Sequence, residues 1–403
     1  MSSQAVPDKK DGAGYAWVIL WVAFIASVAA PLAQMKISPI MPVLMQEFGL
    51  NVAGAGMLMS VFAITGFILA LPAGLIMQRF GVKVTALIST GCVVLGSILG
   101  ALATTSGFML FTRLIEGVGM GLIGVVAPAV ISMWFPPEKR GGPMGIWATW
   151  VPVGMVLMFV LAPMINSAMG WRAVFWFSAI FAAVAFVLVF LFLKAPPMPA
   201  DAKGGPGGPP HGEAPDMKKA LANKDIWLLG ASFGLFNMAL IAISTFYPTF
   251  LNTVKGLDMG QASLISAITM VVVIFSAPLA GILSDKIGSR KKLFTWPFII
   301  LAVMMFFPFN ISIPLVIVWM ILMGIIAGAI PTATFAATPE IMKTPVLAGI
   351  GMAVIAVGQN LGQVLGGVVF GALVDSSGWV AAGIWMVPVL LLGLVAGWLV
   401  KVR

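Results

Sequence analysis

Charged residues are scarce in this chain of 403 residues: only 9% are Asp, Glu, Lys or Arg, whereas 61% are hydrophobic. A soluble globular chain is about one quarter charged and about half apolar, so the composition excludes that class. The apolar stretches run for about 20 residues or more, the length that an α-helix needs to cross a bilayer. They lack the alternation over about ten residues that barrel strands need. We therefore expect an all-α polytopic membrane protein.

Cysteine and histidine each occur once. Cys92 lies in an apolar stretch, so the chain cannot form an internal disulfide, and no cysteine-based metal site is indicated. His211 lies in a Pro- and Gly-rich segment without neighbours that could complete a site. Intramembrane enzymes need paired aspartates, a serine–histidine pair or histidine ligands, and no expected span holds a histidine or two aspartates. We expect no enzyme, no metal and no cofactor.

The apolar stretches predict twelve membrane spans in two halves. The spans are 16–44, 54–77, 84–104, 107–134, 142–165, 171–194, 225–251, 260–284, 292–311, 313–338, 345–374 and 379–401. They divide the chain into a tail (1–15), an N-terminal six-helix bundle (16–194), a flexible linker (195–224) and a C-terminal six-helix bundle (225–403). The first apolar run is too long for a cleavable signal peptide, so we expect span one to be retained.

The basic residues predict the orientation. With both termini in the cytoplasm, all but four of the 22 Lys and Arg residues fall in cytoplasmic segments, as the positive-inside rule requires. The exceptions are Lys36, Arg113, Arg172 and Lys255. The net charge of +9 is thus explained by topology and needs no nucleic-acid partner. We expect a monomer in a plasma membrane, the inner membrane of a bacterium, with the lipid bilayer as its surroundings.

The two halves repeat each other in sequence. The matched pairs are Gly74–Lys83 with Gly281–Arg290, Pro137-Glu138 with Pro339-Glu340, and Gly170-Trp171 with Gly378-Trp379. Two six-helix halves related by an axis along the membrane normal are typical of transporters that bind their substrate near the midplane, between the halves.

These motifs carry a family resemblance. The pattern G-x-L-x-D-x-x-G-x-[RK]-[RK], found as GILSDKIGSRK from Gly281, resembles the signature of the major facilitator superfamily, and Gly74–Lys83 is an imperfect first copy. RLIEGVG, from Arg113 to Gly119, resembles the R-x-x-x-G-x-G motif of span four, and WFPPEKRG, from Trp134 to Gly141, resembles the loop that follows it. The resemblance implies the major facilitator fold and transport by alternating access.

The repeated loop motif is expected to act as a conformational latch. Its residues are Gly74, Gln78, Arg79 and Gly81 in the first copy and Gly281, Asp285, Gly288 and Arg290 in the second. The glycines allow close approach of helix ends, and a carboxylate among helix N-termini and guanidinium groups makes an ionic contact. The resemblance implies that this latch stabilises the outward-open state; anchoring by positive charge alone is the alternative. Because Gln78 stands where Asp285 stands later, we expect the two latches to be unequal.

Few ionisable residues lie within the spans, and such residues are costly in lipid and therefore candidates for function. Lys36, next to Gln34 and before Ser38-Pro39, is a candidate for binding an anionic substrate; the alternatives are snorkelling or pairing with Glu116. Arg113 and Glu116 share one helix face. The resemblance links the arginine to proton coupling, and Glu116 can take up and release a proton. A static Arg113–Glu116 pair that braces the helix is the competing interpretation.

Neutral polar residues supply further candidates for substrate binding. They are Asn237 and Tyr247 in span seven and Gln359, Asn360 and Gln363 in span eleven. In hydrocarbon these groups need hydrogen-bond partners, which are each other, neighbouring helices or the substrate.

The substrate class follows from a second resemblance. DGAGYAW, from Asp11 to Trp17, and the position of Lys36 resemble monocarboxylate transporters. WFPPEKRG and SDKIG are likewise similar to oxalate–formate and monocarboxylate carriers. This implies proton symport of a small organic anion such as a monocarboxylate. Those carriers also hold an arginine before the proline of span eight, where this chain has Ala277-Pro278. The alternatives are proton-driven efflux of weakly polar or drug-like compounds and a transport-inactive sensor or scaffold.

Replacing Asp285 by Asn tests the unequal latches. The change removes the only carboxylate of the two motif copies, so we expect the outward-open population to fall. A distance measurement between spin labels on the two halves would report the shift. An unchanged population would contradict the latch.

Overall fold

The computed structural model describes residues 9–136, 139, 141–194, 222–287, 290–343 and 345–402. Some side chains within these ranges, among them those of Asp285 and Arg290, are outside the description. The regular elements of the described residues are helices, and these residues contain no strand.

The described residues of the first half form a series of helices. They are α1 (Lys9–Met35), the 3-10 helix η1 (Ser38–Ile40), α2 (Met41–Phe48), α3 (Val52–Leu69), α4 (Pro72–Ala101), α5 (Ser106–Trp134), α6 (Gly141–Ala148), α7 (Trp150–Met169) and α8 (Trp171–Phe192). The second half comprises α10 (Lys224–Thr253), α11 (Met259–Ile287), α12 (Arg290–Met304), α13 (Ile313–Ala327), α14 (Ala329–Met342) and α15 (Pro345–Leu399).

The expected twelve-span architecture is confirmed. Ten segments of the described chain are long and apolar enough to span a bilayer, and α12 adds a shorter apolar helix. The last segment counts as two crossings, because α15 turns back at Gly378, whose φ of 80° favours glycine. Several boundaries differ from expectation. The expected spans 16–44, 142–165 and 313–338 are each divided into shorter helices. In addition, α3 ends at Leu69, and a new helix begins at Pro72, a residue that fits the first turn of a helix.

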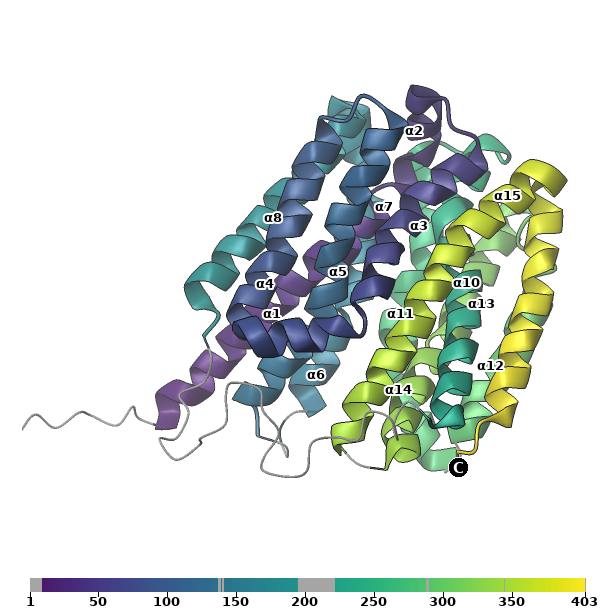
Figure 1. Ribbon diagram of the computed structural model, residues 1–403. Helices are drawn as coiled ribbons and strands as arrows, with labels where there is room; N and C mark the ends of the chain where they lie inside the picture. The colour runs from purple at the N-terminus through teal and green to yellow at the C-terminus, as the bar shows by residue number, and fades with distance from the viewer. Residues whose placement is uncertain are drawn as a thin grey trace, which may run out of the picture.

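The two halves form two bundles side by side (Figure 1). The purple-to-blue helices pack on the left of the view and the green-to-yellow helices on the right. Across the boundary, α3 packs against α15 and α7 against α11. α1 begins and α15 ends at the same end of the molecule, which we call the terminal end. The opposite end, where α3 begins and α15 turns at Gly378, is called the far end.

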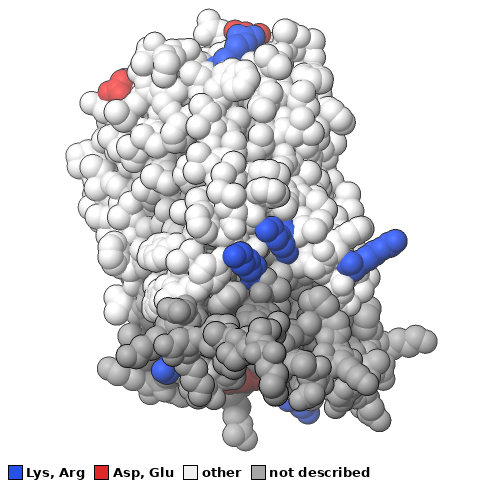
Figure 2. Space-filling view, turned by 90° about the vertical axis from the view of Figure 1, so that its left-hand side faces the viewer, with Lys and Arg blue, Asp and Glu red and all other residues white. Residues whose placement is uncertain are grey.

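The outer surface matches a membrane environment. Figure 2 shows a wide middle band without Lys, Arg, Asp or Glu on the face of the first half, with basic side chains gathered below it. On α8, Trp176, Ile180, Val184 and Val187 are 40–62% exposed. Large apolar side chains in such a band are stable where lipid replaces water.

Glycines bring α10 and α15 into backbone contact. A Cβ added at Gly358 would lie 2.0 Å from the carbonyl oxygen of Gly230, and one at Gly362 would lie 1.9 Å from that of Gly234. Small residues spaced four apart allow helices in membranes to gain packing energy by close approach. The centre of the second bundle therefore depends on the absence of side chains at these four positions.

Replacing Gly362 by Ala is expected to lower the melting temperature of the purified protein, because the new methyl group must push α15 away from α10. The matched control is Gly124→Ala in α5, where an added Cβ meets no atom within 4 Å. In the control, the better helix propensity of Ala should preserve or raise stability. Equal melting temperatures for the two variants would contradict the packing argument.

Candidate functional site

The candidate site lies at the point where α1 is interrupted. An α-helix that continued past Met35 would need a backbone N–H from Pro39, which has none, and α1 ends at Met35. The carbonyl oxygens of Ala33 and Gln34 in the last turn accept from Arg113 of α5, at 2.8 Å from Nη1 and 3.0 Å from Nη2. The arginine therefore caps the broken helix while its Nε donates to the carbonyl of Leu58 in α3 at 3.1 Å.

Glu116 joins two cations in the interior of the first bundle. One carboxylate oxygen accepts from Lys36 Nζ and the other from Arg113 Nη1. All three side chains are fully buried. Of the alternatives that the sequence left open for Lys36, the structure has the pairing with Glu116.

Two serines and an aromatic ring complete the surroundings of Lys36. Ser97 of α4 donates to Glu116 at 2.6 Å and accepts from Lys36 Nζ at 3.0 Å. Ser178 of α8 lies 3.2 Å from the Ser97 hydroxyl. The Lys36 ammonium also lies 4.1 Å from the centre of the Phe175 ring, within the range of a cation–π contact. The charged and hydroxyl side chains among these residues, together with Arg113, form what we call the buried charge network.

The buried charge network carries an excess of positive charge. Its members are Lys36, Arg113, Glu116, Ser97 and Ser178, with two basic groups and one acidic group. Its formal charge is +1 when all three ionisable groups are charged. Burying charge without a partner is expensive, whereas each charge here has a partner.

The network reaches the second bundle through Gln34. The backbone carbonyl of Gln34 holds Arg113, and its side-chain amide donates to Gln363 of α15 at 2.9 Å. Both glutamines are more than nine-tenths buried. The structure therefore brings together five of the predicted site residues, namely Gln34, Lys36, Arg113, Glu116 and Gln363.

The other predicted substrate ligands have local partners. The Asn237 amide donates to the carbonyl of Phe233 at 2.8 Å, and the Tyr247 hydroxyl donates to that of Pro308 at 2.5 Å. Asn360 donates to the carbonyl of Ala356 in its own helix at 2.8 Å. Its side-chain oxygen lies 2.5 Å from where a Cβ of Gly66 would be, so it packs at the α3–α15 contact. Gln359 is half-buried on α15.

The described part of the predicted latch lies at the terminal end. Gln78 and Arg79 are exposed, and Gly81 turns the chain within α4 at a φ of 80°. Gly74 has open space around it, and a Cβ at Gly281 would lie 3.5 Å from Thr332. Gly288 and the side chains of Asp285 and Arg290 lie outside the described residues.

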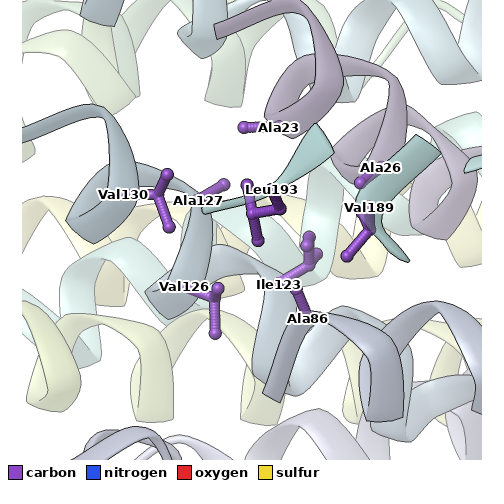
Figure 3. A pocket seen from close by; sticks show the side chains of 9 residues that line it. All are labelled: Ala23, Ala26, Ala86, Ile123, Val126, Ala127, Val130, Val189 and Leu193. Atoms are coloured by element: carbon purple, nitrogen blue, oxygen red, sulfur yellow. The ribbon is translucent and has the colours of Figure 1, made fainter. Parts of the chain in front are cut away.

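Small cavities lie among the described residues of both bundles. One, of about 10 Å³, is lined only by apolar side chains of α1, α4, α5 and α8 and of Leu193 (Figure 3). The other, also about 10 Å³, lies near Ser244, Tyr247, Ser266 and Thr269 of the second bundle. A volume of this size holds about one water molecule, and an apolar lining gives water no partner.

The model of the Major Facilitator Superfamily matches residues 23–261 and 255–403. The chain belongs to this superfamily. It is therefore a multi-pass membrane transporter and not an enzyme.

The sequence identity between this chain and individual relatives is low. The chain is 26% identical over 277 residues to the hexuronate transporter of Bacillus subtilis, and the match covers 68% of this chain and 65% of that one. It is 23% identical over 282 residues to a probable sulfoacetate transporter of Cupriavidus necator, covering 68% and 66%. The match thus spans just under two thirds of either relative. Among solved structures, a bacterial homologue of the human lysosomal transporter Spinster superposes with a TM-score of 0.74, at 18% identity and 95% coverage of both chains.

Replacing Glu116 by Gln is expected to lower the free energy of unfolding by about 3–5 kcal/mol, because two buried cations lose their counter-charge. The matched control is Glu47→Gln, which breaks the exposed Glu47–Arg172 pair (3.4 Å, both side chains at least 40% exposed). Exposed pairs contribute about 0–1 kcal/mol. Unfolding of the detergent-solubilised protein would measure both variants, and a similar small loss in both would contradict a structural need for Glu116.

Proposed function

We propose that this transporter moves a small organic anion, such as a monocarboxylate, together with a proton by alternating access. The observation that carries the proposal is the buried charge network, which joins two cations and one carboxylate and reaches the second bundle through Gln34 and Gln363. The orientation with both termini in the cytoplasm, the bacterial inner membrane and a monomeric state belong to the same proposal.

The charge excess favours an anionic substrate. The network holds two basic groups and one acidic group, so the electrostatic potential around it is positive and attracts a negatively charged solute. The names of the relatives agree with this choice, since hexuronate and sulfoacetate are both organic anions. Lys36 is the group proposed to bind the anion, because it follows the break in α1 and stands two residues from the contact with α15.

Proton uptake by Glu116 would release Lys36. A protonated carboxyl group loses its charge and holds an ammonium group less strongly than a carboxylate does. Arg113 would keep its place, because three backbone carbonyls also accept from it. Lys36 would then be free to turn from Glu116 to the substrate anion. The anion and the proton thus support each other's binding, which is the requirement for symport.

Movement of the substrate would disturb the hydrogen bond that joins the two bundles. Gln34 touches the second bundle and is two residues from Lys36. A rearrangement of Lys36 at the helix break therefore acts on the Gln34–Gln363 hydrogen bond. We assign Asn237, Tyr247, Gln359 and Asn360 to the walls of the substrate path, and the repeated loop motif to the latch at the terminal end.

Replacing Lys36 by Gln is expected to abolish uptake of organic anions into proteoliposomes. The assay compares small mono- and dicarboxylates, inorganic anions and lipophilic cations, with and without an inward proton gradient. Lys255→Gln is the matched control, because Lys255 is a half-buried lysine that donates to the carbonyl of Ile311 outside the network. The control should retain uptake.

Glu116→Gln adds a second readout to the same assay. It should retain exchange of the anion across the membrane but lose the response to the proton gradient. Anion uptake by the Lys36 variant would overturn the site, and movement of lipophilic cations in place of anions would favour efflux.

A further inference from the structure

Asp375 bridges the two bundles at the far end. It lies near the end of the first straight part of α15, before the turn at Gly378. Its carboxylate accepts from the backbone N–H of Val52 at 3.1 Å and from that of Ala53 at 2.8 Å. These two residues begin α3 in the other half of the chain.

The first turn of α3 depends on this carboxylate. The first N–H groups of any helix have no partner within the helix. In α3, Asn51 serves as the N-cap and accepts from Gly54 at 2.9 Å. The N–H groups of Val52 and Ala53 bond to Asp375 instead. The helix thus takes two of its capping bonds from the opposite bundle, and its dipole adds an attraction for the negative charge.

Close packing makes this bridge sensitive to motion. A Cβ added at Gly371 would lie 2.8 Å from the Cα of Ala53, and one at Gly56 would lie 2.2 Å from the carbonyl oxygen of Gly367. The backbones of α3 and α15 therefore touch over this stretch. The two bundles cannot separate at the far end without breaking both bonds to Asp375.

Other contacts between the bundles include hydrogen bonds from hydroxyl groups. Ser38 donates to the carbonyls of Ser244 and Thr245 at 2.9 and 2.7 Å, and Ser60 donates to that of Val364 at 2.6 Å. These contacts use neutral donors and acceptors. Asp375 differs from them, because it is an ionisable side chain that hydrogen-bonds across the boundary between the bundles.

We propose that Asp375 is a lock that holds the far end closed by capping α3 from the opposite bundle. It favours the conformation in which the bundles are joined at the far end, and it must release α3 before that end opens. Asp375 is thus a positioning residue for transport, because it sets the balance between the two conformations without touching substrate. This assignment holds whichever solute is carried.

The test measures the far end directly. Spin labels are attached to cysteines introduced at Leu102 and Val254, which are 58% and 53% exposed, one in each half, with Cys92 replaced by Ser. Pulsed electron paramagnetic resonance then gives the distribution of distances between the labels in the full-length protein in lipid nanodiscs. No substrate is needed, so the result is independent of the proposed anion transport.

Asp375→Asn is expected to raise the ratio of far-end-open to far-end-closed molecules about tenfold, the effect of losing one charge-assisted contact. Asp375→Glu keeps the charge and should give a smaller shift, which also separates the lock from a general folding defect. The matched control is Asp258→Asn, because Asp258 accepts from the N–H of Gln261 at the start of α11 within its own half.

The control should leave the distances unchanged. An unchanged distribution in Asp375→Asn, or an equal shift in Asp258→Asn, would overturn the lock. A shift that Asp375→Glu reproduces in full would also overturn it, since the charge would then be irrelevant.

Discussion

A charged group inside a membrane protein has no water to solvate it, so it needs a partner within the protein. The first bundle is organised around this constraint. Glu116 supplies the negative charge that both Lys36 and Arg113 require, and without it two cations would remain unpaired in the interior. Arg113 in turn supplies the donors that the broken end of α1 lacks. The same arginine therefore satisfies an electrostatic need and a backbone need, and α1, α3 and α5 are held together at one point.

Polar contacts between the bundles follow a different rule from those within them. Inside the first bundle, charges are buried and paired at short range. Between the bundles, the contacts are single hydrogen bonds, such as Gln34–Gln363, or a carboxylate at the exposed far end. Weak neutral bonds and a solvent-accessible charge are easier to break than a buried ion pair. The distribution of polar groups therefore separates a rigid interior from a boundary that can open.

Much of the fold could be predicted from the sequence, because twelve apolar runs and a repeated loop motif leave few alternatives. Lys36, Arg113 and Glu116 could be selected as ionisable residues in spans, but their pairing could not be decided, since it joins helices far apart in the chain. Ser97 and Ser178 gave no signal, because small hydroxyl residues are common in membrane helices. Asp375 lay at the end of a span, where charges are ordinary, so only the position of α3 reveals its role.

The two adjacent glycines Gly366 and Gly367 set how α15 can move. A Cβ on the first would lie 2.5 Å from the carbonyl oxygen of Met238 in α10, and a Cβ on the second would lie 2.8 Å from that of Gly56 in α3. The helix is thus wedged between a partner in its own bundle and a partner in the other. Rotation of α15 about its axis would drive it into one neighbour as it left the other. The second bundle must therefore move as one rigid body. The first bundle separates from it at the contact between α3 and α15.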